Sequence, residues 1–270
     1  MKASTPRRAA KEGEIRAYYR TLLNAWGPQH WWPAESSFEV ILGAFLTQNT
    51  SWTNVERALA NLRAENLLSL DGIRRVPLPD LERWIRPSGY FRQKAQRLKA
   101  FIAFLDQRYA GSLLKLFAQP TNRLREELLA LNGIGPETAD SILLYAGNHP
   151  VFVVDAYTRR IMERHKILPE KSDYEEIRQL FERALAPVAS ETAGALVARR
   201  PNLDAGIPST AHAPSQMSTA PRSVLAQGYN EMHGLIVGVG KHYCKKAQPI
   251  CEGCPLQPFL PLRRRRTIRS

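Results

Sequence analysis

The sequence predicts an all-α protein, and three observations lead to this fold class. Apolar residues recur with the spacing of a helical face almost throughout the chain, and no convincing alternating pattern of a strand is present. Proline and glycine divide these apolar stripes into segments of helical length. The 270 residues, 44% hydrophobic and 23% charged, supply an ample core for one or two domains. We therefore expect roughly ten helices.

Three apolar stripes define helices in the first half of the chain. They begin near Phe38, Val55 and Ala95, and each places its apolar side chains on one face. Thr53 and Glu56 have the spacing of a capping box, which predicts where the second of these helices begins.

The composition changes at residues 187–227, where Ala, Ser, Thr and Pro dominate and aromatic residues are missing. Such a segment buries too little apolar surface to offset the entropy of ordering it, so we expect a disordered insertion here. Helical periodicity resumes at Tyr229, which indicates that the insertion interrupts a domain.

The net charge of +13 is concentrated at the two ends of the chain. Residues 1–14 are expected to form a basic flexible tail, and residues 263–270 an arginine-rich one. Such tails are compatible with solvated anchors and with a phosphate-bearing partner. No apolar stretch reaches the length of a membrane helix and no secretory signal is recognisable, so we expect a soluble cytoplasmic protein without a membrane partner.

The most informative stretch joins two predicted helices at residues 131–140. Gly133 and Gly135 allow a tight turn, and Pro136 is well accepted in the first turn of the second helix. The N–H groups at such a helix start can bind a phosphate oxygen. Because an ordinary turn between helices has the same residues, the hairpin alone leaves both interpretations open.

A second candidate is Asp155. The apolar run Val151–Val154 leads into it, and a helical stretch begins at Ala156. The carboxylate at this point is either an N-cap of that helix or an acid–base group close to a bound sugar.

Four motifs in this order resemble the helix-hairpin-helix DNA glycosylase superfamily, on its endonuclease III branch. They are Leu46–Thr50, Gly133–Asp140, Val153–Tyr157 and the cysteine pattern Cys244-x6-Cys251-x2-Cys254. The resemblance is closest to the monofunctional 3-methyladenine DNA glycosylases of this branch. It implies a two-lobed helical fold over residues 15–262 with the DNA cleft between the lobes, one lobe formed by 15–36 plus 150–256 and the other by 37–149.

The resemblance also implies the roles of individual residues. Asp155 becomes the catalytic carboxylate. The base pocket would be formed by Trp31, Trp32 and Trp52, although each tryptophan is equally compatible with a core position. Gln48 would be inserted into DNA beside the extruded nucleotide. The further DNA-binding residues would be Asn49, Gly133, Ile134, Gly135, Thr138, Lys245 and Lys246.

Glu137 separates two kinds of chemistry. Bifunctional members of the branch carry a lysine at this position, whose amine forms a Schiff base with the sugar. A carboxylate cannot do so, which favours hydrolysis of the N-glycosidic bond through an oxocarbenium-like transition state. Alkylated purines such as 3-methyladenine are good leaving groups for a single carboxylate. Lys241 also falls on a lysine of the 3-methyladenine group, without an assigned role.

The cysteine pattern resembles the iron–sulfur loop of the branch, in which four thiolates hold a [4Fe–4S] cluster. Leu260 stands at the fourth position. Cys244, Cys251 and Cys254 could hold a cluster with an outside ligand, bind zinc with His242, or remain free thiols.

The sequence therefore predicts a monomeric, monofunctional DNA glycosylase that flips an alkylated purine out of double-stranded DNA and leaves an abasic site for an endonuclease, associated with the nucleoid in a bacterium. One alternative is an endonuclease III-like glycosylase and lyase that acts on oxidised pyrimidines. The other is a DNA-binding protein without catalysis. Such a protein would have no use for the Asp155 carboxylate near the anionic DNA backbone.

Overall fold

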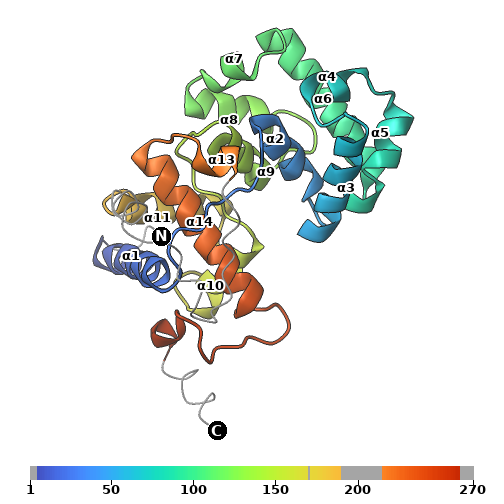
Figure 1. The fold of residues 1–270 in the computed structure, drawn as a ribbon. Coiled ribbons are helices and arrows are strands. Elements are labelled where there is room, and N and C mark those ends of the chain that lie inside the picture. Colours follow the sequence, from blue (N-terminus) through green and yellow to red (C-terminus); the bar gives the residue numbers. More distant parts are fainter. Residues whose placement is uncertain (1–4, 170, 190–214, 262–270) are drawn as a thin grey trace. The chain divides into compact units, whose positions relative to one another are not determined.

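The computed structural model describes residues 5–169, 171–189 and 215–261, and this part of the chain is all-α (Figure 1). No strand occurs among the described residues, in agreement with the expected fold class. The chain divides into two compact units, unit 1 formed by residues 1–33 and 150–270 and unit 2 by residues 34–149. The first boundary thus lies at 33/34, not at the expected 36/37. None of the described helices is both long enough and apolar enough to cross a bilayer.

Unit 2 is built around a short helix that is buried along almost its whole length. This helix, α2, packs against α3, α6, α9 and η2. The elements of the unit are α2 (Ser37–Leu46), α3 (Trp52–Ala64), α4 (Leu70–Arg75), α5 (Leu78–Trp84), η1 (Arg86–Ser88), α6 (Phe91–Tyr109), α7 (Leu113–Phe117), α8 (Thr121–Leu129), α9 (Pro136–Ser141) and η2 (Ile142–Ala146).

The expected capping box of α3 is wrong. Ser51 is the N-cap residue, and its side chain makes no capping hydrogen bond. The helix begins at Trp52, so Thr53 lies inside its first turn and cannot cap it. By contrast, Ser36 caps α2 by accepting a hydrogen bond from the Glu39 N–H at 3.1 Å.

A buried lysine fixes the end of α2. Lys94, which is 1% exposed on α6, donates from Nζ to the carbonyl oxygens of Leu46 at 2.8 Å and of Ser88 at 2.6 Å. Burial, with a smaller contribution from Arg97, lowers its pKa to about 8. Lys94 therefore joins α6 and η1 to the last residue before the turn at Thr47–Thr50.

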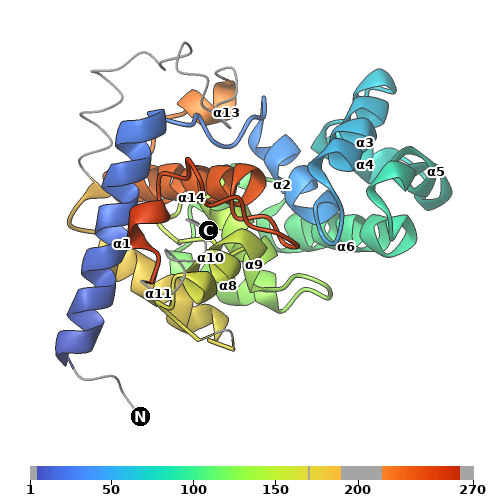
Figure 2. The ribbon, with the colours of Figure 1, turned by 90° about the horizontal axis from the view of Figure 1, so that it is seen from below.

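Unit 1 is centred on its longest apolar helix. This helix, α14, packs against α1, α10 and α11 (Figures 1 and 2). Figure 2 shows the last described segment of the chain returning to α1, where Phe259 packs edge-on against Tyr18. The elements are α1 (Thr5–Trp26), α10 (Ala156–Arg164), α11 (Tyr174–Leu185), α13 (Gln216–Thr219), α14 (Val224–His242) and η3 (Gln257–Phe259).

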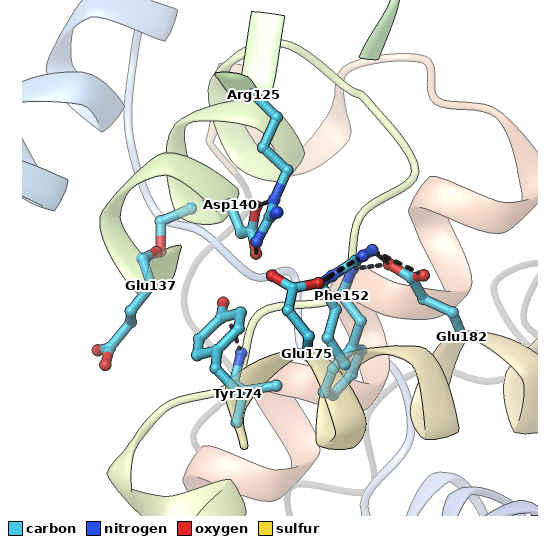
Figure 3. A network of polar contacts seen from close by, with 10 residues as sticks. Arg125, Glu137, Asp140, Phe152, Tyr174, Glu175 and Glu182 are labelled. Carbon is cyan, nitrogen blue, oxygen red and sulfur yellow. Dashed lines mark hydrogen bonds and ion pairs between the residues drawn. The ribbon is translucent and has the colours of Figure 1, made fainter. Parts of the chain in front are cut away.

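The β-like run Val151–Val154 is buried without belonging to a sheet. Its backbone N–H groups are bound by side chains of α11: Phe152 donates to Glu182 at 3.0 Å and Val154 donates to the Tyr174 hydroxyl at 3.3 Å (Figure 3). These bonds satisfy two N–H donors that would otherwise need the carbonyl oxygens of a neighbouring strand. They also fix the chain immediately before Asp155.

The expected flexible tail at 1–14 is wrong for its described part, because α1 already begins at Thr5. Glu12 accepts a hydrogen bond from Arg183 of α11 at 3.1 Å, and Ile15 is completely buried. Residues 1–4 and the arginine-rich segment 263–270 lie outside the described residues.

Both ends of the expected disordered insertion are helical or buried. Val188 and Ala189 are buried, and Gly228 lies so close to Ala189 that a Cβ at this glycine would approach the Ala189 side chain to 2.8 Å. At the other end, Ser223 caps α14 by accepting from the Ala226 N–H at 3.2 Å. The expected bounds 187 and 227 are therefore too wide, and residues 190–214 lie outside the described part of the chain.

Candidate functional site

The hairpin of unit 2 has the predicted helix, turn, helix order. The turn lies between the end of α8 at Leu129 and the start of α9 at Pro136. Gly133 has a φ of +80°, and a Cβ there would overlap the side chain of Arg97, so this position requires glycine. Gly135 has an extended backbone and open space around its Cα, so it permits close approach from outside but no special dihedral angle.

Gln48 is bound to this hairpin through both ends of its amide. Its Nε2 donates to the carbonyl of Gly133 at 3.1 Å and to the Thr138 hydroxyl at 3.0 Å. Its Oε1 accepts a hydrogen bond from Arg97 at 2.7 Å. The turn after α2, the hairpin and α6 thus meet at one amide, within unit 2.

The other expected DNA-binding residues differ in what they can offer to a ligand. The Ile134 side chain is buried and its N–H donates to Leu131, so this N–H is not available to a phosphate oxygen. Asn49 is exposed in the left-handed region at φ +53°, which asparagine tolerates better than most residues. In unit 1, Lys245 and Lys246 are exposed, and Arg164 binds their carbonyl oxygens at 2.6 and 2.8 Å.

Glu137 lies exposed in the first turn of α9. Figure 3 shows its carboxylate pointing away from the buried pair of Arg125 and Asp140, which are joined by two hydrogen bonds of 2.6 and 3.1 Å. The charge of Asp140 is therefore used inside unit 2, whereas that of Glu137 faces outward.

Asp155 is the N-cap residue of α10, as the first of the two interpretations of the sequence predicts. Its Oδ1 accepts from the N–H of Thr158 at 2.7 Å and from the Thr158 hydroxyl at 2.9 Å. The side chain is buried, yet Oδ2 lies 3.5 Å from Nε2 of His233 on α14. One carboxylate oxygen thus caps the helix while the other faces an imidazole.

Electrostatics keep this carboxyl group ionised. Burial by itself raises the pKa of Asp155, but His233 and the two hydrogen bonds from Thr158 outweigh burial and hold it below its ordinary value. A buried carboxylate with one oxygen turned away from its helix cap can stabilise a positive charge or orient a water molecule. The sequence pattern indicates no role for His233. The one signal is its place in the apolar stretch of α14, one helical turn after Tyr229.

The three tryptophans of the expected base pocket are divided between the units. Trp31 and Trp32 are buried in unit 1 with their rings edge to face at 5.5 Å between centroids. Trp31 also lies beside His233, at 6.2 Å, and Lys241 places its Nζ 5.8 Å from the centre of the same ring. Trp52 is half-buried and begins α3 in unit 2.

The cysteine loop of unit 1 is fastened to α10 by arginine. Arg160 donates to the carbonyl of Cys244 at 2.6 Å, and Arg164 approaches its Sγ at 3.4 Å. None of these three cysteines forms a disulfide, and they line a cavity of about 20 Å³, which holds about one water molecule. Leu260 is buried in the wall of this cavity.

These contacts bear on whether the cysteine loop could be a metal centre. No group of three or more His, Cys, Asp or Glu side chains in the described ranges is arranged to hold a metal ion. Burial raises the pKa of Cys254 to about 11, so a metal bound here would have to displace the proton of this thiol. With the apolar Leu260 at the fourth position, the described residues do not complete the four-thiolate set of a [4Fe–4S] cluster.

In sequence, this chain is similar to known DNA repair proteins. HhH-GPD superfamily base excision DNA repair proteins match residues 42–187. A Methanocaldococcus jannaschii protein named as a candidate DNA repair glycosylase is 39% identical over 246 residues, which cover 91% of this chain and 94% of the relative. Endonuclease III of Thermotoga maritima is 26% identical over 230 residues, which cover 85% of this chain and 84% of that protein.

Two solved structures extend this likeness to three dimensions. The 3-methyladenine DNA glycosylase MagIII of H. pylori, bound to 1,N6-ethenoadenine, aligns with a TM-score of 0.64 and 30% identity, covering 86% of this chain and 97% of that chain. Endonuclease III in a non-covalent DNA complex aligns with a TM-score of 0.67 over 96% of this chain and 99% of that chain. At 20% identity, the second comparison shows a shared fold and nothing further.

Proposed function

The chain belongs to the HhH-GPD superfamily of base excision DNA repair glycosylases, and from this premise we propose that it is monofunctional and hydrolyses the N-glycosidic bond of a damaged purine in double-stranded DNA. The observation that carries the proposal is the buried, ionised carboxylate of Asp155, whose Oδ2 is turned away from its helix cap. A carboxylate in this position suits a reaction in which positive charge develops on a sugar.

In the proposed reaction the base leaves with the electron pair of the N-glycosidic bond, and the sugar becomes oxocarbenium-like. Asp155 stabilises this cation and orients a water molecule, whose oxygen attacks C1′ and whose proton passes to the carboxylate or to solvent. Thr158 keeps the carboxylate in place through its two hydrogen bonds. Asp155 is therefore assigned as the catalytic residue.

The absence of lyase chemistry is inferred from Glu137. Its exposed carboxylate occupies the position at which the sequence resemblance implies a lysine in bifunctional enzymes. A carboxylate forms no imine with the sugar, so the strand is expected to remain intact at the abasic site. A separate abasic-site endonuclease is then needed to continue repair. We also propose that the glycosylase acts as a monomer in the cytoplasm.

The choice of a purine is supported by one relative of the same fold. The H. pylori enzyme, at 30% identity, is named a 3-methyladenine glycosylase and is bound to 1,N6-ethenoadenine, also a modified purine. The paired rings of Trp31 and Trp32 are buried in the unit that carries Asp155, and we propose that the extruded base reaches them there. Stacking on an aromatic side chain stabilises a bound base by about 1–3 kcal/mol.

The cysteine loop is proposed as a structural arm that carries Lys245 and Lys246 toward the DNA backbone. Arg160 and Arg164 fasten this arm to α10, and we propose that these contacts hold its geometry. Iron and zinc analysis of the purified protein tests this assignment: stoichiometric metal, with loss of duplex binding upon its removal, would overturn it.

A panel of duplex oligonucleotides tests the proposed function. Each duplex carries one modified base, and product is scored before and after alkali. We expect cleavage only after alkali, and fastest for an alkylated or etheno purine. Cleavage before alkali, or preference for an oxidised pyrimidine, would favour the endonuclease III-like alternative.

A further inference from the structure

A buried carboxylate on α14, distinct from Asp155, binds the backbone that leads to Trp31. Glu231 is 1% exposed, and its Oε2 accepts from the Gln29 N–H at 2.7 Å. The carboxylate also receives a hydrogen bond from the backbone of His30. Its Oε1 accepts from Gln227 at 3.0 Å, one turn earlier on α14. Two consecutive backbone donors thus converge on one side chain.

The next turn of α14 touches the same segment. A Cβ at Gly234 would come to 3.1 Å from the Cβ atoms of Gln29 and Trp31, so glycine here lets the segment lie directly on the helix. His30, between them, has a φ of +51°, in the left-handed region that few residues other than glycine adopt. The hydrogen bond to Glu231 and the close contact with Gly234 hold this segment against α14.

The same helix also faces Asp155. Nε2 of His233 lies 3.5 Å from Oδ2 of Asp155. The centre of the same imidazole ring lies 6.2 Å from the centre of the Trp31 ring. Glu231, His233 and Gly234 are therefore successive contacts of one rigid element with the aromatic segment and with the carboxylate, all within unit 1.

We infer that Glu231 is a positioning residue, which holds the backbone of Gln29 and His30 and thereby sets the place of Trp31 relative to Asp155. The inference rests on the proposed function, because it requires that Trp31 contacts the extruded base. A carboxylate suits the task better than an amide because both of its oxygens accept hydrogen bonds. A displacement of about 1 Å in such a segment costs on the order of a hundredfold in rate.

The charged and polar groups around Glu231 come from two elements. Arg222 approaches from the segment before α14, and Gln227 from the first turn of that helix. The backbone of Gln29 and His30 approaches from the segment after α1. Burial raises the pKa of Glu231 to about 7, against the opposing effect of these four groups. Below this pH a proton occupies one oxygen and removes an acceptor.

The experiment compares Glu231→Gln with wild type and with Glu176→Gln, a control at an exposed glutamate of the same unit. Single-turnover base release is measured on the preferred lesion and on a second purine lesion, together with affinity for an undamaged duplex. We expect Glu231→Gln to release the preferred base about ten to a hundredfold more slowly and to lose selectivity, with duplex affinity within about twofold. The wild-type selectivity should fall below pH 7, and that of Glu231→Gln should be independent of pH in this range.

Gly234→Ala provides a second variant if Glu231→Gln does not fold. The added methyl group presses on Gln29 and Trp31 while Glu231 stays in place, and we expect the same loss of selectivity. Wild-type rates and selectivity in either folded variant would show that the contact is only part of the core. Failure of the proposed function is distinguishable, since the wild-type protein would then release no base from any duplex of the panel.

Discussion

Nε2 of His233 lies 3.5 Å from Oδ2 of Asp155, while the other oxygen of the same carboxylate caps α10. The imidazole and the helix cap together oppose the effect of burial, which would otherwise raise the pKa of this carboxyl group. A group that the proposed mechanism requires to be ionised is thus kept ionised inside the core.

The first prediction concerns pH. In His233→Gln the charge that lowers the Asp155 pKa is removed, so this pKa rises and the acid limb of base release moves to higher pH. On that limb a pKa one unit higher lowers the rate about tenfold, and the rates converge above neutral pH. The measurement is the single-turnover rate between about pH 4.5 and 8. This range spans the ordinary pKa values of carboxyl and imidazole groups.

His165→Gln is the matched control, because His165 is also buried in unit 1 but binds Tyr18 at 2.7 Å. Its pH profile should match that of wild type. An unshifted acid limb in His233→Gln would mean that the imidazole does not govern the ionisation of Asp155.

The second prediction concerns Gln48, which binds the hairpin through Gly133 and Thr138. If this bond holds the hairpin in its DNA-binding form, Gln48→Ala and Thr138→Val each weaken duplex binding, and the double variant is little worse than either single one. The coupling energy should reach about 0.5–3 kcal/mol in affinities measured at one salt concentration.

A strictly additive double variant would argue against this bracing role. It would favour the role that the sequence resemblance implies, in which the Gln48 side chain fills the space left by the extruded base. In that case Gln48→Ala would also impair excision from duplex far more than from single-stranded DNA.

The third prediction concerns Glu137. Borohydride added during turnover should trap no covalent complex with wild-type protein, because no imine forms at this position. In Glu137→Lys the new amine would lie in the first turn of α9, where the helix dipole lowers its pKa and favours the neutral nucleophile. A small trapped fraction in this variant is expected.

Trapping by the wild-type protein in good yield would contradict the hydrolytic mechanism. Lys241, whose Nζ lies 5.8 Å from the centre of the Trp31 ring, would then be the first amine to replace.

The sequence predicts the local features of the fold well. The hairpin with Pro136 at the start of α9 and the buried apolar run that leads to Asp155 occur where glycine, proline and apolar spacing place them. Such features depend on residues close together in the chain, so their physical cause is present in the pattern itself. The helix at Thr5–Glu14 is the opposite case, since its stabilising partner Arg183 lies 171 residues away.

The site was predictable only in part for the same reason. Asp155 and Gln48 are visible as candidates, but their partners are His233 on α14 and Thr138, the latter 90 residues away. Glu231 is hidden more completely, because nothing in an apolar helix shows that its carboxylate faces the backbone of Gln29. Long-range polar contacts of this kind are set by packing, not by local propensity.

The most direct test of the account is base release by Asp155→Asn, measured with its affinity for the same lesion-bearing duplex. Asparagine can still cap α10, so folding should be preserved. We predict that single-turnover release falls about a hundredfold or more while the dissociation constant changes little, because the carboxylate acts on the transition state and not on bound DNA. Undiminished base release by this variant would contradict the assignment of Asp155 and the mechanism built on it.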